Sequence, residues 1–161
     1  MSVDGVKKLT CRISPDSFDV GPGEGSLRGV KRLAWVWGPS IAWAAFLFVM
    51  SSIPGQALPP LNGSFLGIDS DKLIHGGVYA VLGALVWRSV RRTWRIAPFR
   101  AALVAAAAAA LYGVTDEVHQ IFTPRRSPDW HDALADAVGG LAGALLISAA
   151  CVSFATRRPD R

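Results

Sequence analysis

Two long uncharged segments constrain the fold of this chain more than any other feature of its sequence. Residues 33–53 and residues 137–156 contain no Asp, Glu, Lys or Arg, and each has about the 20 residues that a membrane-spanning helix requires. A soluble helical bundle would have to bury both segments, which leaves little of a 161-residue chain to face water. The sequence therefore predicts an integral membrane protein in preference to a soluble bundle.

Two shorter apolar segments lie between the long ones. Each has an uncharged core of 15 residues, at 73–87 and 101–115, and each reaches spanning length if its helix continues through polar residues at one end. Ser127, Pro128 and Asp129 predict the start of the last helix, with Ser127 as the N-cap. We therefore expect an all-α, polytopic membrane bundle of four transmembrane helices. The expected spans are residues 33–53, 71–90, 97–122 and 130–156.

Basic residues are distributed unevenly between the two ends of these spans. Of the 17 Lys and Arg residues, 14 lie in the N-terminal segment, around the connection between the second and third spans, or at the C-terminus. Cytoplasmic segments of membrane proteins carry such an excess, so we expect both termini to be cytoplasmic. Residues 1–30 and 157–161 would then be cytoplasmic tails of a membrane domain at 31–156. The net charge of +5 fits this topology, which favours the lipid bilayer and not nucleic acid as the partner.

Acidic residues and histidines gather toward the opposite side, which would be the outer one. Residues four apart lie on one face of a helix, so Asp71 shares a face with His75, and Asp132 shares a face with Asp136. The third helix runs in the opposite direction and brings three more polar residues to a similar depth. These are Asp116, Glu117 and Gln120. A charge at the centre of a membrane helix costs about 2.5–3.5 kcal/mol, so we expect these side chains to face a polar, net-negative pocket between the helices.

This pocket supplies the candidate site residues. Glu117 and His75 would serve as acid/base or ligand groups, and Arg126 would orient a carboxylate or phosphate of the bound molecule. We also expect Arg126 to reach an acid such as Glu117 or Asp132, and we interpret Lys72 as a contact to lipid headgroups. The candidate catalytic residues are Glu117, His75 and Asp132. The candidate ligand-binding residues are Asp71, Asp116, Gln120, Arg126 and Asp136.

Several functions fit such a pocket. A recognition or catalytic site would act on a molecule at the outer face of the membrane. A metal-dependent hydrolase would use His75 with neighbouring carboxylates, although the sequence contains no His-Glu-x-x-His motif or cysteine ligand pair that names a metal or cofactor. A proton or ion relay would need titratable residues in the inner halves of the helices, where the sequence offers few. A non-enzymatic accessory protein would use the cluster only to hold the bundle together.

These residues, in this order, resemble the VanZ-like family of bacterial membrane proteins. The resemblance runs from about Ser51 to Gly143 and rests on five short stretches. They are Ser51-Ser52-Ile53-Pro54, Asp71-Lys72-x-x-His75-x-x-x-Tyr79-x-x-x-Gly83, Asp116-Glu117-x-x-Gln120-x-Phe122, Arg126 followed by Asp132, and Gly139 with Gly143. The chain departs from the family pattern at two positions, with Asp136 where Asn is usual and Arg125 where Gly is frequent.

The resemblance implies a multi-span protein of the bacterial plasma (inner) membrane. The founding member of the family is associated with resistance to the glycopeptide antibiotic teicoplanin, which is a phenotype and not a mechanism. The ligand classes that the resemblance implies are a lipid headgroup, a cell-wall precursor or a glycopeptide of the cell envelope. Enzyme and binding protein both stay open, and no metal or cofactor is named.

Overall fold

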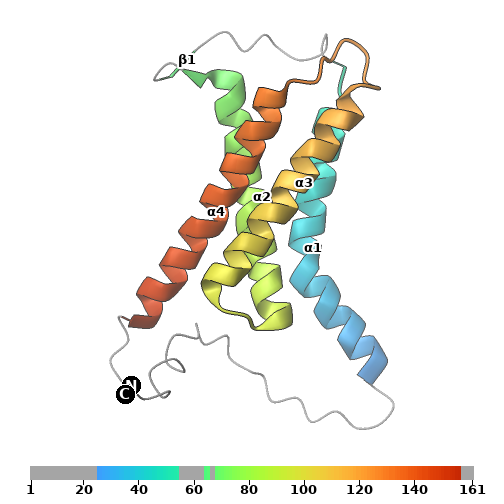
Figure 1. Cartoon of the computed structure of the whole chain (residues 1–161). Helices are drawn as coiled ribbons and strands as arrows, with labels where there is room; N and C mark the ends of the chain where they lie inside the picture. The colour runs from blue at the N-terminus through green and yellow to red at the C-terminus, as the bar shows by residue number, and fades with distance from the viewer. Residues whose placement is uncertain (1–24, 55–63, 66–67, 157–161) are drawn as a thin grey trace.

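The computed structural model describes residues 25–54, 64–65 and 68–156. Four helices make up nearly all of this part of the chain (Figure 1). They are α1 (Gly25–Ser51), α2 (Ser70–Trp94), α3 (Pro98–Gln120) and α4 (Trp130–Thr156). A short antiparallel ribbon of β1 (Ser64–Phe65) and β2 (Ile68–Asp69) precedes α2. Each helix is long and apolar enough to cross a membrane, and the predicted all-α bundle of four such helices is confirmed.

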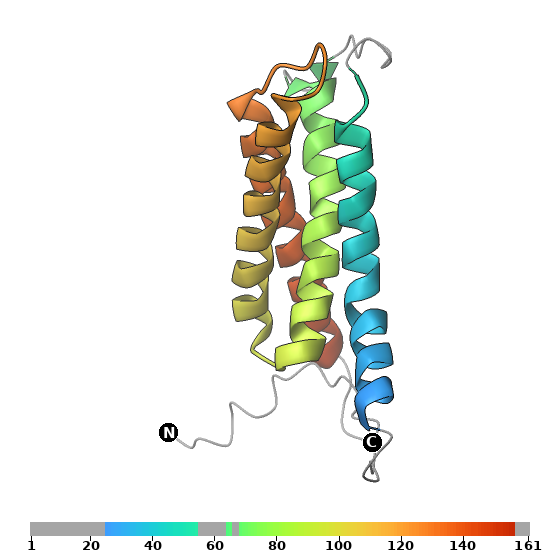
Figure 2. The same ribbon diagram turned by 90° about the vertical axis from the view of Figure 1, so that its right-hand side faces the viewer.

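Successive helices run in opposite directions and lie side by side along their length (Figure 1, Figure 2). The end of α1, the β ribbon and the α3–α4 connection lie together at one end of the bundle, which we call the acidic end. The start of α1, the α2–α3 connection and the end of α4 lie at the other, which we call the basic end. Its arginines on α2, α3 and their connection are Arg88, Arg91, Arg92, Arg95 and Arg100.

The starts of the helices follow local signals in the sequence. Pro98 opens α3, at a position whose N–H would have no partner within the helix. Asp129 caps α4, because its Oδ1 accepts the backbone N–H of His131 at 2.9 Å. The predicted cap at Ser127 is therefore wrong by two residues. Helix α1 begins at Gly25 and not near residue 33, because an uncharged segment marks the apolar core of a helix and not its end.

Helices α2 and α4 pack through small residues that let their backbones touch. A Cβ atom added to Gly139 would collide with the backbone of Gly76, and one added to Gly143 would collide with the backbone of Ala80. Small-residue faces of this kind permit close approach of membrane helices. The contact holds the two helices in a fixed register, which decides which polar side chains face one another at the acidic end.

The apolar side chains divide into an inner face of small residues and an outer face of large ones. Helix α3 turns alanines inward, and Ala101, Ala105 and Ala109 are fully buried. Large apolar side chains point outward, and Leu146 and Leu111 are 71% and 68% exposed. A soluble protein would not expose so much contiguous apolar surface, whereas lipid tails cover it. The packing therefore agrees with the membrane-spanning composition of the helices.

Candidate functional site

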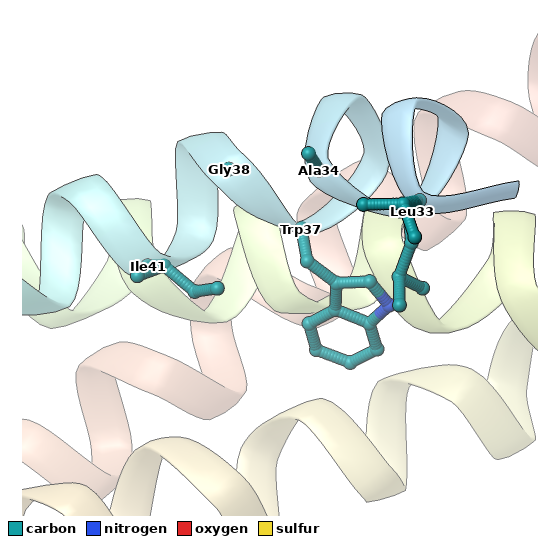
Figure 3. A pocket seen from close by; sticks show the side chains of 6 residues that line it. Leu33, Ala34, Trp37, Gly38 and Ile41 are labelled. Carbon is teal, nitrogen blue, oxygen red and sulfur yellow. The ribbon is translucent and has the colours of Figure 1, made fainter. Parts of the chain in front are cut away.

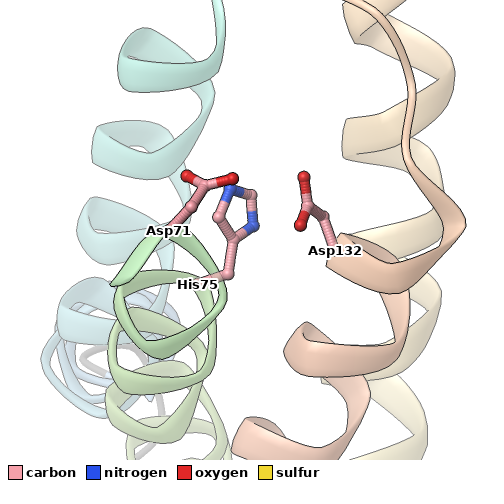
Figure 4. A group of neighbouring side chains, drawn as sticks. All are labelled: Asp71, His75 and Asp132. Carbon is pink, nitrogen blue, oxygen red and sulfur yellow. The ribbon is translucent and has the colours of Figure 1, made fainter. Parts of the chain in front are cut away.

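The polar residues of three helices converge at the acidic end. They come from the first two turns of α2, the last two turns of α3 and the first two turns of α4. Figure 4 shows part of this convergence, with the imidazole of His75 between the carboxylates of Asp71 on its own helix and Asp132 on the opposite one. We divide the cluster by depth. The rim consists of Asp71, Lys72, Asp129 and Asp132, and the floor consists of His75, Asp116, Glu117 and Asp136.

The rim is held by one lysine. Lys72 Nζ donates to Asp132 Oδ1 at 2.9 Å and to Asp129 Oδ2 at 3.2 Å, which joins α2 to the start of α4. Asp129 also accepts the backbone N–H of His131 and faces its imidazole Nδ1 at 2.7 Å. The N–H of His131, then its imidazole, then Lys72 lower the pKa of Asp129 to about 2. Asp129 is therefore ionised throughout the physiological pH range.

The floor is centred on a contact between α2 and α4. Asp136 is fully buried, and its Oδ1 accepts a hydrogen bond from His75 Nδ1 at 3.0 Å. The other oxygen, Asp136 Oδ2, has no hydrogen-bond partner among the described residues. It faces α3 at Gly113, where an added Cβ atom would lie 3.0 Å from this oxygen. The glycine thus makes room for a buried carboxylate at the junction of three helices.

Helix α3 contributes two more buried acids to the floor. Asp116 and Glu117 are each 7% exposed. Glu117 Oε2 accepts the backbone N–H of Asp129 at 2.8 Å, which ties α3 to the cap of α4. Gln120 Nε2 reaches Glu117 Oε1 and Asp116 Oδ2 at 3.4 and 3.5 Å, at the long limit of a hydrogen bond. Asp116 Oδ1 has no partner within the described residues.

The structure gives Lys72 the place that the sequence analysis assigned to Arg126. Arg126 Nε donates to the backbone carbonyl of Ile53 at 3.4 Å, so it joins the α3–α4 connection to the end of α1. The sequence predicts a headgroup contact for Lys72, whereas the structure pairs Lys72 with Asp132. The one available signal is the position of Lys72 beside Asp71 in the first turn of α2.

The remaining histidines lie away from the floor. His119 faces α1, with Nε2 3.0 Å from Ser52 Oγ and its ring stacked on Phe48. His131 stays at the rim, half exposed and bonded to Asp129. Of the three histidines in the chain, His75 alone enters the acidic floor.

Two groups of side chains are arranged closely enough to share a cation. One ligand atom from each of His75, Glu117 and Asp136 lies within 4.8 Å of the others, and the same holds for Asp71, His75 and Asp132. The six acids of the rim and floor face one lysine among the described ion pairs. The cluster therefore has an excess of negative charge and can hold a cation or a positively charged part of a ligand.

A separate hollow lies on the described surface away from this cluster. It has a volume of about 560 Å³ and lies along α1 toward the basic end. Figure 3 shows that Leu33, Trp37 and Ile41 line it with apolar side chains from this one helix. A hollow of this kind on an outward face suits a lipid tail and carries no catalytic groups.

A comparison with protein families decides the family of the chain. The model of the VanZ/LLP1 family matches residues 36–152. The chain belongs to the VanZ/LLP1 family. No curated protein and no solved structure matches it. Together with the four apolar helices, the match makes this VanZ/LLP1 chain a multi-pass membrane protein, as the sequence predicts.

The structure explains one of the two departures from the VanZ-like pattern. Arg125 has a φ of 58°, in the left-handed region that glycine adopts without strain and other residues avoid. A glycine at this position would therefore suit the turn better than the arginine present. The second departure places the buried carboxyl group of Asp136 in the floor of this VanZ/LLP1 protein, where the VanZ-like pattern has an amide.

Proposed function

We propose that this VanZ-family membrane protein binds or modifies a cell-envelope molecule at the outer face of a bacterial plasma membrane, through the rim and floor of the acidic end. The observation that carries the proposal is the burial of acids from α3 and α4 in one place, beside His75 of α2. Asp116, Glu117 and Asp136 are buried with a single lysine nearby at the rim. Buried ionisable residues of membrane helices are costly and usually serve binding or transport.

The orientation follows from the distribution of charge. The arginines of the basic end favour the cytoplasmic side by the positive-inside rule, which turns the acidic end outward. A ligand there meets Asp71 and Asp132 first, since they lie at the rim. Carboxylates only accept hydrogen bonds, so the ligand class is one that offers an ammonium group, hydroxyls or amide N–H groups. Lipid headgroups, cell-wall precursors and glycopeptides all offer such donors.

The proposed roles divide between ligand contact, acid/base chemistry and positioning. Asp71, Asp132 and Gln120 contact the ligand, with Lys72 fixing the distance between α2 and α4. Glu117 and His75 act as acid/base or ligand groups. Arg126 joins the α3–α4 connection to the end of α1 through its Nε, and its other guanidinium donors orient a carboxylate or phosphate of the same molecule. The alternative in which the cluster only holds the bundle together predicts loss of folding, and not loss of function alone, when one acid is neutralised.

Glu117→Gln separates these alternatives. An amide oxygen can still accept the N–H of Asp129, so the variant keeps the α3–α4 contact and loses the charge. The control is Glu24→Gln, the same change in the N-terminal segment that the sequence predicts to be cytoplasmic. Both variants and the wild type are expressed at matched membrane levels in a teicoplanin-sensitive Gram-positive host, and the minimum inhibitory concentration is measured.

We expect the wild type and Glu24→Gln to raise teicoplanin tolerance and Glu117→Gln to leave it at the level of the empty host. Equal protection by Glu117→Gln would refute the role of the pocket. Absence of protection from the wild type would remove the glycopeptide from the ligand classes. If Glu117→Gln cannot be brought to the membrane level of the wild type, the structural alternative is favoured.

A further inference from the structure

We propose that the floor of the pocket is a binding site for one divalent transition-metal ion of the Zn²⁺ class, with His75, Glu117 and Asp136 as its protein ligands. The proposal goes beyond the binding of an envelope molecule, because it concerns a resident ion that can be measured without any such molecule. The site would be built by α2, α3 and α4 together.

The three side chains lie close enough together to bind a single metal ion. One ligand atom of each lies within 4.8 Å of the other two. In a tetrahedral zinc site with bonds of about 2.0–2.2 Å, neighbouring ligand atoms are roughly 3.4 Å apart. His75 Nδ1 and Asp136 Oδ1 are already 3.0 Å apart. The Glu117 ligand atom lies within 4.8 Å of both, so it would have to move by no more than roughly 1.4 Å to reach the spacing of a zinc site.

Two buried acids of the floor have carboxylate oxygens without hydrogen-bond partners among the described residues. Asp136 is fully buried, and its Oδ2 has no partner in the described residues. This oxygen faces α3 at Gly113, one helical turn from Glu117 on the same face. Asp116 is 7% exposed and also has an oxygen, Oδ1, without a partner. A buried carboxylate oxygen is costly without a hydrogen bond or a cation, and a metal ion at the floor supplies that interaction.

The donor set indicates the class of metal. One imidazole nitrogen and two carboxylate oxygens suit Zn²⁺ and related transition metals, whereas Mg²⁺ and Ca²⁺ prefer oxygen ligands alone. Three protein ligands leave the fourth position open for water or a ligand group. Metal binding at His75 Nδ1 requires this nitrogen to be free of its proton, so the neutral imidazole would carry its proton on Nε2. Asp71 and Asp132 form the other group of close ligand atoms with His75, and their carboxylates can accept a hydrogen bond from this N–H.

The floor is a better site than the rim for electrostatic reasons. At the rim, Lys72 Nζ lies 2.9 Å from Asp132 Oδ1 and already satisfies that carboxylate. No lysine or arginine forms an ion pair with Glu117 or Asp136 among the described residues. A divalent cation therefore adds the most electrostatic stabilisation at the floor, where Glu117 and Asp136 lack a permanently charged partner.

The test uses the full chain, purified in detergent, freed of its affinity tag and stripped with a chelator. Binding of Zn²⁺ is measured by isothermal titration calorimetry, and the shift in thermal unfolding temperature on adding Zn²⁺ is measured separately, with Mg²⁺ as the comparison ion. Asp136→Asn keeps the volume of the side chain and introduces the amide usual in the family. His75→Asn and His131→Asn form a matched pair, because both remove an imidazole and His131 stays at the rim.

We expect the wild type to bind one Zn²⁺ per chain with thermal stabilisation, and Mg²⁺ to give neither. His75→Asn and Asp136→Asn should weaken Zn²⁺ binding by more than roughly 10-fold, while His131→Asn leaves it within about twofold. Absence of saturable binding to the folded wild type would overturn the proposal, and so would equal binding by folded Asp136→Asn. Teicoplanin protection without zinc binding would refute the metal site alone, and zinc binding without protection would count against the glycopeptide alone.

Discussion

Replacement of Gly139 by alanine should damage the bundle and the pocket together. A Cβ atom at this position would lie 2.7 Å from the Cα and from the carbonyl carbon of Gly76. Carbon atoms in contact are about 3.5–4.0 Å apart, so α2 and α4 must separate by roughly 1 Å at this level. His75 and Asp136 lie on the same two helices, one turn or less away. Their 3.0 Å hydrogen bond would then lengthen to about 4 Å and be lost.

The loss of stability can be worked from these two effects. Overpacking of a close contact costs about 1–3 kcal/mol, and loss of a hydrogen bond to a charged group costs about 1.5–3 kcal/mol. Alanine recovers about 1 kcal/mol of helix propensity over glycine. The net expectation for Gly139→Ala is a loss of about 1.5–5 kcal/mol in the free energy of unfolding.

The assay is reversible unfolding in mixed micelles, followed by helical circular dichroism as the fraction of denaturing detergent rises. Gly77→Ala is the matched control, because an added Cβ atom there meets nothing within 4 Å. We expect the control to be neutral or more stable by up to about 1 kcal/mol. If Gly139→Ala unfolds at the same midpoint as Gly77→Ala, the close contact between α2 and α4 is refuted.

Two further predictions concern the α3–α4 connection. Arg125→Gly should stabilise the protein by about 1 kcal/mol, because it removes a side chain from a residue in the left-handed region. Arg125→Ala is the control, because it loses the same charge but keeps the Cβ atom. An equal gain in stability from Arg125→Ala in the same unfolding assay would contradict the explanation. His131 and Lys72 lower the pKa of Asp129 from its ordinary value near 3.8 to about 2. The ionised Asp129 therefore stabilises the fold fully above about pH 4, and this stabilisation is lost as the pH falls from about 4 to about 2. Thermal unfolding across this pH range should show the loss in the wild type and a smaller loss in Asp129→Asn, and identical pH profiles would count against the proposed capping interaction.

The sequence predicts the helices of this protein well, because a bilayer imposes strong conditions on composition. A span needs a long apolar segment with few charges, and that requirement can be read from residue types without knowledge of packing. The same condition predicts that the acids of α2, α3 and α4 meet at one depth, since the helices alternate in direction. Helix ends are less well predicted. Helix α1 begins at Gly25, before the basic residues that precede the apolar segment. A membrane-spanning helix can include such polar residues beyond its apolar part, so charge alone does not mark where it begins.

The partners of the charged side chains could not be predicted from the sequence. The choice between Lys72 and Arg126 as the partner of Asp132 depends on the path of the α3–α4 connection. That path includes the left-handed turn at Arg125, which no residue type there announces. The position of Asp136 opposite Gly113 depends on the register of α4 against α3, which arises from contacts between small residues at many points along the helices.

The outward direction of the acidic end is the central claim, and cysteine labelling tests it most directly. In a background with Cys11 and Cys151 replaced by alanine, single cysteines are introduced at Ser127 on the α3–α4 connection and at Thr93 at the end of α2, both exposed positions. Intact cells are treated with a membrane-impermeant thiol reagent, and permeabilised cells show that both positions can react. We expect Ser127→Cys to label in intact cells and Thr93→Cys to label only after permeabilisation. The opposite pattern would place the acidic pocket in the cytoplasm and contradict the proposed function.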